Sequence, residues 1–274
     1  MFKDKNFNYA VFGNPIDHSK SPAIHNFFSN QTGVFHTYGS INVPLNKFSS
    51  IILDFFKHNG KGANITAPFK QEAYCISHEL TERAKIAQSV NTLKKTDKGY
   101  ILGDNTDGIG LLSDLIRLDF IKKKYSVLIL GAGGAARGIL FPLLSFGCSI
   151  FIMNRTLSNT KKLIKQFNRY GKINIFNKDI LKYKIFDLII NATSQSLEEE
   201  NSIIDLSLIS SNTCIYDMNY KKNKKSFLNT FVHVKSTKFS NGIGMLVFQA
   251  AHSFELWHNV FPETDKIINI LKAE

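Results

Sequence analysis

Cysteine is scarce in this chain of 274 residues, which has three of them: Cys75, Cys148 and Cys214. They are scattered, and no two of them form a Cys-x-x-Cys pair. An odd and scattered set argues against a disulfide framework and against a zinc site, and it favours a reducing cytoplasm. Residues 1–10 carry charges where a signal peptide would be apolar, so no signal peptide is expected.

Long apolar runs are missing as well. The most apolar region, residues 126–153, is interrupted by glycines, by Pro142 and by Arg137. A helix that crosses a membrane needs about 20 consecutive apolar residues. The region therefore predicts a strand, a helix and a second strand, and no membrane partner is expected.

Arginine is scarce too. The formal net charge of +12 rests on 34 basic residues, but five of these are arginines and the lysines are spread along the chain. Nucleic-acid-binding proteins usually gather arginine and aromatic side chains on one face. A nucleic-acid partner is therefore not expected, whereas a hydrophobic content of 43% is enough for an ordinary globular core.

The sequence does contain a regular alternation of strand-like and helix-like segments. In the first hundred residues, we expect strands at 9–13, 36–43 and 62–66 and helices at 21–33, 48–60 and 68–78. A second unit begins near residue 107, with strands at 126–134, 149–156, 173–177, 186–194 and 213–220 and helices at 135–147, 158–167, 244–260 and 264–274. Such alternation predicts an α/β fold with a mostly parallel sheet covered by helices. The lysine-rich segment 221–225 is expected to be a surface turn.

A glycine-rich segment, Gly131 to Ala136, follows an apolar strand and opens a helix. This is the context that a dinucleotide-binding fingerprint requires. Gly131 permits a tight turn, Gly133 lets the backbone approach a pyrophosphate, and Ala136 lets helix and strand pack closely. The start of the helix then offers N–H groups and the positive end of a dipole to the phosphates.

The next strand indicates which dinucleotide is bound. About twenty residues after the first glycine, an NAD site would place Asp or Glu at the adenosine ribose. This chain has Asn154, Arg155 and Thr156 there, with no carboxylate. Arg155 can fork onto a 2′-phosphate, and Thr156 or Ser158 can donate hydrogen bonds to it. NADP(H) is therefore the predicted cofactor; the alternative is an ordinary surface arginine after a strand.

Two charged side chains stand at predicted helix starts. Lys70 follows Asn64 and Thr66 in the segment NITAPFK, and a lysine in a first helical turn lies against the helix dipole. That unfavourable placement favours an acid–base role for Lys70. Asp107 lies at the start of another helix, where capping alone would explain it.

Two serines lie near the N-terminus, in the stretch HSKSP. Ser19 and Ser21 precede a helix whose first turn contains Pro22. Two hydroxyl groups at the positive end of a helix dipole suit a ligand carboxylate. The alternative interpretation is a helix cap.

Nine motifs in order resemble the shikimate dehydrogenase family, and they cover residues 11 to about 257. They are VFGNPIDHSKSPAIHN, NITAPFK, SVNT, GDNTDGIG, GAGGAA, NRT, NATS, YDMNY and GIGMLVFQAAHSFELW. The resemblance implies two α/β domains: a substrate-binding domain of residues 1–106 plus 239–274 and a Rossmann-like NADP-binding domain of residues 107–238. It also implies an NADP-dependent oxidoreductase that reversibly reduces 3-dehydroshikimate to shikimate, in the pathway to chorismate and the aromatic amino acids.

The resemblance also assigns roles to individual residues. Lys70 and Asp107 match the catalytic pair. The substrate positions are matched by Ser19, Ser21, Thr66, Lys70, Asn91, Asp107, Tyr220 and Gln249. The cofactor positions are matched by Glu82, Gly131, Ala132, Gly133, Gly134, Ala135, Asn154, Arg155, Thr156, Leu157, Ser158, Asn159, Met218 and Gly242.

The chain departs from the family pattern at two places. The family commonly has Gly-Ala before VNT, where this chain has Gln88 and Ser89, and a glycine where this chain has Ser196. The first departure is expected to affect packing beside Asn91, and the second the loop near the cofactor.

Two other functions stay open. One is a quinate/shikimate dehydrogenase with broader cofactor use, against which the absence of an acidic residue after the NRT motif speaks. The other is a non-catalytic relative that has kept the cleft, against which the intact pair of Lys70 and Asp107 speaks. No metal is expected, because the spacing of the histidines (His18, His25, His252 and His258) matches no ligand pattern. The sequence leaves open whether the protein is a monomer or a homodimer.

Overall fold

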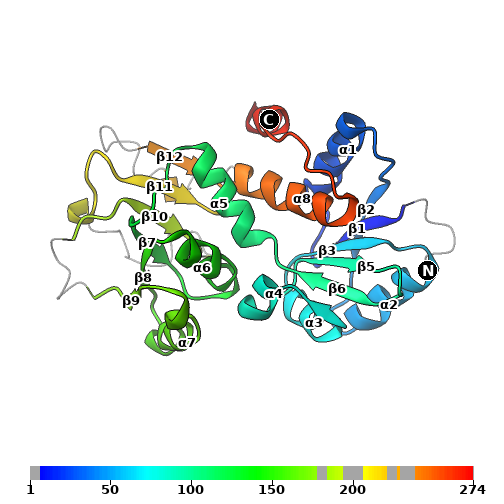
Figure 1. Ribbon diagram of the computed structural model, residues 1–274, viewed down its shortest axis with the longest axis horizontal. Helices are drawn as coiled ribbons and strands as arrows, with labels where there is room; N and C mark the ends of the chain where they lie inside the picture. Colours follow the sequence, from blue (N-terminus) through cyan, green and yellow to red (C-terminus); the bar gives the residue numbers. More distant parts are fainter. Residues whose placement is uncertain (1–6, 178–183, 194–205, 221–226, 229–237, 274) are drawn as a thin grey trace. The chain divides into compact units, whose positions relative to one another are not determined.

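The computed structural model describes residues 7–177, 184–193, 206–220, 227–228 and 238–273 (Figure 1). The chain divides into two compact units. The first contains Met1–Gly110 and Leu246–Glu274, and the second contains Leu111–Met245. Each unit is built around its own six-stranded sheet.

The first sheet has the strand order β2-β1-β3-β5-β6-β4. Its strands are β1 (Tyr9–Gly13), β2 (Tyr38–Asn42), β3 (Gly62–Ile65), β4 (Glu79–Leu80), β5 (Thr92–Lys95) and β6 (Ile101–Asp104). Strand β1 runs parallel to β2 and β3, whereas β5 is antiparallel to β3 and β6. The helices of this part are α1 (Ser21–Thr32), α2 (Phe48–His58), α3 (Lys70–Ile76) and α4 (Glu82–Ala87).

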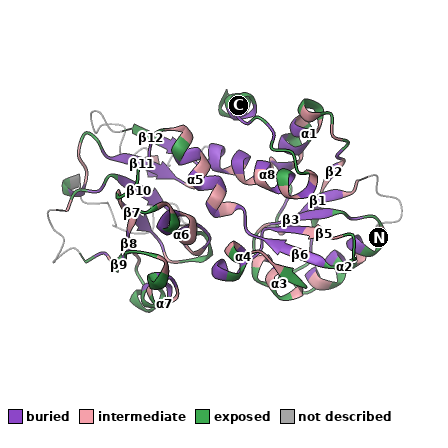
Figure 2. Ribbon diagram, viewed as in Figure 1, coloured by how far each residue is buried: buried purple, intermediate pink, exposed green. Residues whose placement is uncertain are grey.

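Helix α2 shows how the apolar pattern builds the first core. Its residues Ile52, Phe55 and Phe56 are buried. The rings of Phe55 and of Phe12 in β1 pack edge to face, with their centroids 5.2 Å apart. Phe28 of α1 is likewise fully buried. Figure 2 shows most of the central strands in the buried colour and the outer faces of the helices in the exposed colour. These phenylalanines are core residues, and their helical spacing places them on the inner faces of α1 and α2.

The second sheet has the order β12-β11-β10-β7-β8-β9, and all of its neighbouring strands are parallel. Its strands are β7 (Ser126–Leu130), β8 (Ser149–Met153), β9 (Ile173–Ile175), β10 (Leu188–Asn191), β11 (Cys214–Asp217) and β12 (Lys238–Asn241). Helices α6 (Gly134–Phe146) and α7 (Leu157–Phe167) connect successive parallel strands. Parallel strands buried on both faces are almost purely apolar, as β7 and β10 are here.

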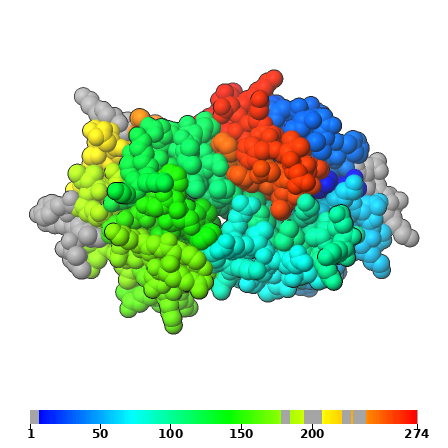
Figure 3. All heavy atoms as spheres, viewed as in Figure 1, coloured from blue at the N-terminus to red at the C-terminus, as the bar shows by residue number. Residues whose placement is uncertain are grey.

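Three helices complete the described chain: α5 (Asp107–Arg117), α8 (Ile243–His258) and α9 (Asp265–Ala273). The division between the two units falls inside α5 and inside α8. The C-terminal residues, red in Figure 3, lie against the blue N-terminal residues of the same unit. Gln31 of α1 and the backbone of Glu263 exchange two hydrogen bonds there, of 3.2 and 2.8 Å.

The predicted α/β class is confirmed. The sequence analysis did not predict β4, β5, β6, β12 or α4, all of which are six residues long or shorter. Helix α3 begins at Lys70, so Pro68 lies in the preceding turn and not in the helix. Residues 221–225 and Ser196 lie outside the described residues.

Strand β12 pairs with β11, so the chain leaves the second sheet only after Asn241. The domain boundaries expected at 106/107 and 238/239 stay predictions. Within the described residues, no helix is long and apolar enough to cross a membrane.

Candidate active site

The ion pair of Lys70 and Asp107 is the centre of the site in the first unit. Lys70 is the first residue of α3 and Asp107 the first residue of α5. The Lys70 Nζ atom lies 2.5 Å from Asp107 Oδ2, with 33% and 17% of the two side chains exposed. The pair is therefore sheltered but still open to a solute, as an acid–base group must be.

Asn91 connects this pair to the rest of the unit. It is 2% exposed and lies just before β5. Its Nδ2 atom donates to Asp107 Oδ1 at 2.8 Å and to Gln249 Oε1 of α8 at 3.3 Å. Four of the predicted substrate residues, from four separate segments of the chain, are thus in one hydrogen-bonded group.

Thr66 lies in the turn between β3 and α3 and is half-buried. Its backbone N–H donates to the carbonyl of Phe12 at 2.9 Å. This bond joins the segment that leads to Lys70 to the end of β1.

The two serines of HSKSP have different positions at the start of α1. Helix α1 begins at Ser21, which is 7% exposed, and Lys20 occupies the N-cap position without a side-chain cap bond. The Ser21 N–H donates to Ser19 Oγ at 3.3 Å. The interpretation of Ser21 as a helix cap is therefore wrong: Ser19 supplies the oxygen, because the helix begins one residue earlier than a cap at Ser21 requires.

Three histidines gather in the first unit but form no metal site. Among the described residues, no group of three or more His, Cys, Asp or Glu side chains is placed to hold a metal. His36 and His258 share a hydrogen bond of 2.9 Å between Nδ1 and Nε2. Burial, with a smaller contribution from His258, lowers the pKa of His36 to about 3. His25 stacks on the Tyr38 ring at 4.1 Å, so this group is part of an aromatic core.

In the second unit, the glycine-rich segment has the backbone geometry of a phosphate-binding turn. Gly131 has a φ of +102°, and a Cβ atom there would lie 3.2 Å from the Ala192 carbonyl oxygen, so only glycine fits without strain. Helix α6 begins at Gly134, with Gly133 as N-cap. Gly133, Gly134 and Ala135 are exposed, which leaves the first N–H groups of the helix open to an anion.

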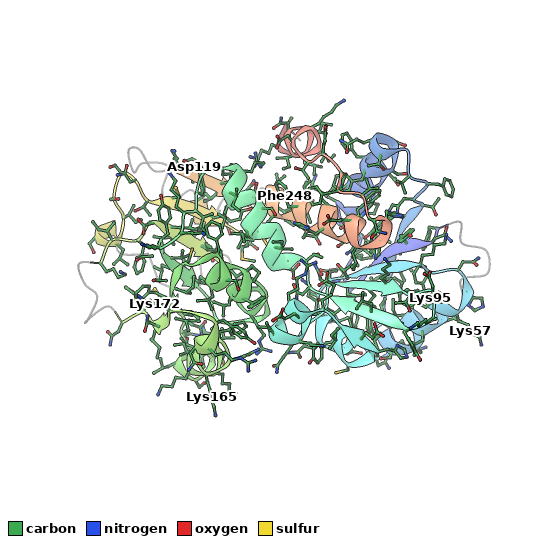
Figure 4. All side chains as sticks on the ribbon, in the orientation of Figure 1. Lys57, Lys95, Asp119, Lys165, Lys172 and Phe248 are labelled. Atoms are coloured by element: carbon green, nitrogen blue, oxygen red, sulfur yellow. The ribbon has the colours of Figure 1, made fainter. Side chains whose placement is uncertain are left out.

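The segment after β8 has the polar groups that fit a 2′-phosphate. Asn154 Nδ2 donates to the carbonyl of Thr156 at 2.9 Å, which holds the turn in place before α7. The five residues from Arg155 to Asn159 are exposed. Figure 4 shows Lys165 of α7 and Lys172, which precedes β9, pointing away from the fold. This unit therefore fits a dinucleotide with an additional phosphate.

Met218 and Gly242 are brought together at the carboxyl ends of β11 and β12. A Cβ atom on Gly242 would clash with the Met218 carbonyl group, so glycine permits the close approach. Asp217 supports this end of the sheet, since its Oδ1 accepts from Asn191 Nδ2 at 3.0 Å and from the Asn219 N–H at 3.1 Å. In parallel α/β sheets ligands bind at this edge.

Two predicted residues are placed less specifically. Glu82 is the exposed first residue of α4, and no described contact ties it to a cofactor site. Tyr220 lies three residues after the end of β11 and is half-buried. Both assignments stay predictions.

An ion pair that was not predicted anchors α4. Asp104 is fully buried and accepts from Arg83 Nε at 2.7 Å, from Arg83 Nη2 and from the Asn105 N–H at 2.7 Å. Asp104 lies inside the motif GDNTDGIG, but no local pattern indicates Arg83 as its partner.

The departure at Gln88 and Ser89 can now be described. Gln88 has a left-handed φ of 50°, where the glycine common in the family would be unstrained. Ser89 is buried, and its Oγ accepts from Asn105 Nδ2 at 2.8 Å. The departure therefore adds a hydrogen bond beneath the start of α5 and does not displace Asn91.

Three family models match the chain. They are the shikimate dehydrogenase substrate binding domain over residues 11–93, shikimate/quinate 5-dehydrogenase over 116–210 and the shikimate 5′-dehydrogenase C-terminal domain over 242–272.

Similar proteins span the whole chain. A shikimate dehydrogenase (NADP(+)) of Buchnera aphidicola subsp. Acyrthosiphon pisum is 65% identical over 271 residues, which is 99% of each chain. One of subsp. Schizaphis graminum is 63% identical over 274 residues, 100% of each. The crystal structure of the Thermus thermophilus shikimate 5-dehydrogenase in complex with NADP(H) and shikimate is 28% identical, with a TM-score of 0.84 over 97% of this chain and 98% of that one.

Proposed function

The chain belongs to the shikimate dehydrogenase family, as its nine motifs predicted, and from this membership we propose that it reversibly reduces 3-dehydroshikimate to shikimate with NADPH. The observation that carries the proposal to the level of residues is the 2.5 Å pair of Lys70 and Asp107, sheltered but reachable at the starts of two helices. It is an NADP-dependent oxidoreductase of the pathway to chorismate and the aromatic amino acids.

The reduction of a ketone needs a hydride on carbon and a proton on oxygen. NADPH, when bound, supplies the hydride. The ammonium group of Lys70 donates the proton to the carbonyl oxygen, so that the C=O group becomes CH–OH. In the oxidation direction the neutral amine of Lys70 accepts the hydroxyl proton. Asp107 holds the Lys70 amine in position in both directions.

The remaining polar residues of the first unit orient the substrate. Ser19 and Ser21 stand at the positive end of the α1 dipole, where a carboxylate is favoured. Thr66, Asn91 and Gln249 face the ring hydroxyls and the carbonyl. The hydrogen bonds of Asn91 with Asp107 and Gln249 support this assignment, because they hold these polar groups beside the catalytic pair.

The second unit holds the cofactor. The turn from Gly131 to Ala135 and the start of α6 bind the pyrophosphate, and residues 154–159 bind the adenosine 2′-phosphate. Met218 and Gly242 flank the nicotinamide. The close approach that Gly242 permits brings the two assigned residues together and so supports this assignment.

One assay with four substrate–cofactor pairs tests the proposal. Purified protein is given shikimate or quinate with NADP⁺ or NAD⁺, and reduced cofactor is followed at about 340 nm. We expect turnover with shikimate and NADP⁺ to exceed the other three. Comparable turnover of quinate with NAD⁺ would favour the broader quinate/shikimate dehydrogenase, and no turnover with any pair would favour a non-catalytic protein.

The proposal includes a cytoplasmic location and a small assembly. The scattered reduced cysteines support a cytoplasmic protein. The protein acts on a small molecule as a monomer or a homodimer, and sedimentation of the purified chain distinguishes the two.

A further inference from the structure

A continuous line of hydrogen bonds runs through the core of the first unit to Asp107. Tyr38 Oη donates to Asn64 Oδ1 at 2.7 Å, and Asn64 Nδ2 donates to Thr92 Oγ1 at 3.1 Å. Thr92 Oγ1 donates to Asn91 Oδ1 at 2.9 Å, and Asn91 Nδ2 donates to Asp107 Oδ1 at 2.8 Å. We call these four donors, Tyr38, Asn64, Thr92 and Asn91, the donor chain.

The direction of the donor chain is fixed by main-chain groups. The Thr106 N–H, which can only donate, points at Asn91 Oδ1 at 2.8 Å, so the Asn91 amide must turn its Nδ2 toward Asp107. The Asn91 carbonyl, which can only accept, lies 3.3 Å from Asn64 Nδ2. Asn64 Oδ1 must therefore face Tyr38, and the Tyr38 hydroxyl must be the donor.

The hydroxyl of Thr92 joins the two amides. It accepts from Asn64 Nδ2, and its single hydrogen has two acceptors within reach, Asn91 Oδ1 at 2.9 Å and Ser253 Oγ at 2.8 Å. When Thr92 donates to Asn91, every member of the donor chain points a hydrogen toward Asp107, and Lys70 donates to the other oxygen of the same carboxylate.

Burial makes this arrangement effective. Tyr38, Asn64, Thr92 and Asn91 are 8%, 5%, 0% and 2% exposed. In a site without water, hydrogen bonds arranged head to tail polarise one another, and a bond to a charged group is stronger than a neutral one. Burial also raises the pKa of Tyr38 well above its ordinary value, so its hydroxyl stays a donor.

We propose that Thr92 is a positioning residue for the catalytic pair, because its hydroxyl and the Thr106 N–H together hold the oxygen of the Asn91 amide, whose Nδ2 stabilises the Asp107 carboxylate. The inference rests on the proposed function of Lys70 and Asp107. Tyr38 and Asn64 support Thr92 from behind. None of these three needs to contact the substrate for this role.

The test compares two buried hydroxyl groups in the same core. Thr92→Val removes the hydroxyl of the donor chain and keeps the shape of the side chain. Ser253→Ala removes an equally buried hydroxyl of α8, which accepts from Asn64 Nδ2 at 3.0 Å and gives its own hydrogen to the Gln249 carbonyl. It lies 2.8 Å from Thr92 Oγ1, so its removal leaves Asn91 Oδ1 as the acceptor for the Thr92 hydrogen and keeps the step from Thr92 to Asp107 intact. The measurements are kcat and KM for shikimate across pH, with the melting temperature of each variant.

We expect Thr92→Val to lower kcat about tenfold, the factor that corresponds to about 1.4 kcal/mol, with little change in the KM for NADP⁺. The acidic limb of its kcat profile should move to higher pH, because the Asp107 carboxylate has lost support. Thr92→Ser should restore kcat to within about twofold, and Ser253→Ala should leave kcat and the profile unchanged.

A purely structural role gives a different result. Equal losses of kcat in Thr92→Val and Ser253→Ala, or an acidic limb that does not move in Thr92→Val, would overturn the proposal. If Thr92→Val does not fold, Tyr38→Phe at the head of the donor chain takes its place: a shift of the limb in the same direction supports the proposal, and an unchanged limb rejects it. Full activity in Lys70→Ala would instead reject the proposed function. This variant therefore distinguishes a failure of the proposed function from a failure of the inference about Thr92.

Discussion

The histidine pair of the first unit should make that unit sensitive to acid. His36 is 3% exposed and hydrogen-bonded to His258, and burial lowers the pKa of His36 to about 3. An unfolded histidine titrates near 6.5. The folded state therefore keeps His36 neutral, while the unfolded state takes up a proton as the pH falls below that value. Stability is fully present above about pH 6.5 and is lost progressively toward about pH 3.

The size of the loss follows from linkage. At about pH 5 the unfolded histidine is almost fully protonated and the folded one is not, so His36 alone costs about 2 kcal/mol of unfolding free energy relative to neutral pH. His258, whose pKa burial and the nearby Lys94 and Lys61 lower to about 4, acts in the same direction. For a unit of this size, about 2 kcal/mol corresponds to a fall of about 8 °C in melting temperature.

The chain has a single tryptophan, which makes the measurement specific. Trp257 lies in the first unit, with its ring 5.6 Å from the His36 ring. Urea unfolding followed by tryptophan fluorescence, near pH 7 and near pH 5, therefore reports on the unit that contains the histidines. His36→Phe should reduce the pH dependence by about 2 kcal/mol and leave the part that His25 and His258 contribute, whereas His18→Asn, at an exposed histidine, should leave all of it unchanged. Unfolding free energies that agree at the two pH values, or a His36→Phe variant with the original pH dependence, would refute the reasoning.

Three further predictions concern the proposed activity. Lys70→Ala should lower kcat by about 10²–10⁴-fold with little change in shikimate affinity, because the proton transfer acts in the transition state; single-turnover kinetics measures this, and unchanged turnover would reject the assignment. Ser19→Ala and Ser21→Ala should each weaken shikimate binding about tenfold and leave NADP(H) affinity nearly unchanged in calorimetry; equal losses for both ligands would indicate a structural role. Arg155→Gln should raise the KM for NADPH by about 10–100-fold and that for NADH far less; parallel changes would show that Arg155 does not contact the 2′-phosphate.

Local chemistry in the sequence was enough to predict much of the fold and of the cofactor segment. Gly131 lies between an apolar strand and a helix, and its φ of +102° is one that glycine adopts without strain. Gly33 ends α1 in the left-handed conformation, and Pro22 lies in its first turn. These features depend on neighbours within a few residues, so they can be recognised in the sequence.

The short antiparallel strands β5 and β6 were not predicted, because their sequences, TLKK and ILGD, mix apolar residues with charged residues and a glycine and show no regular alternation. Their pairing nevertheless decides where Asn91 and Asp107 lie, since Thr92 pairs with Asp104 across the two strands. The same holds for Arg83 and Asp104, which are far enough apart in sequence that no local rule connects them.

The sequence by itself determined the alternation of strands and helices, the phosphate-binding turn and the identities of Lys70 and Asp107, because each depends on a local motif or on residue type. Only the tertiary structure decided that Tyr38, Asn64, Thr92 and Asn91 donate in one direction toward Asp107. It also decided that His36 meets His258 across 222 positions of sequence. The physical reason is the same in both cases: a hydrogen bond depends on a separation of about 3 Å in space, and sheet pairing and helix packing set that separation.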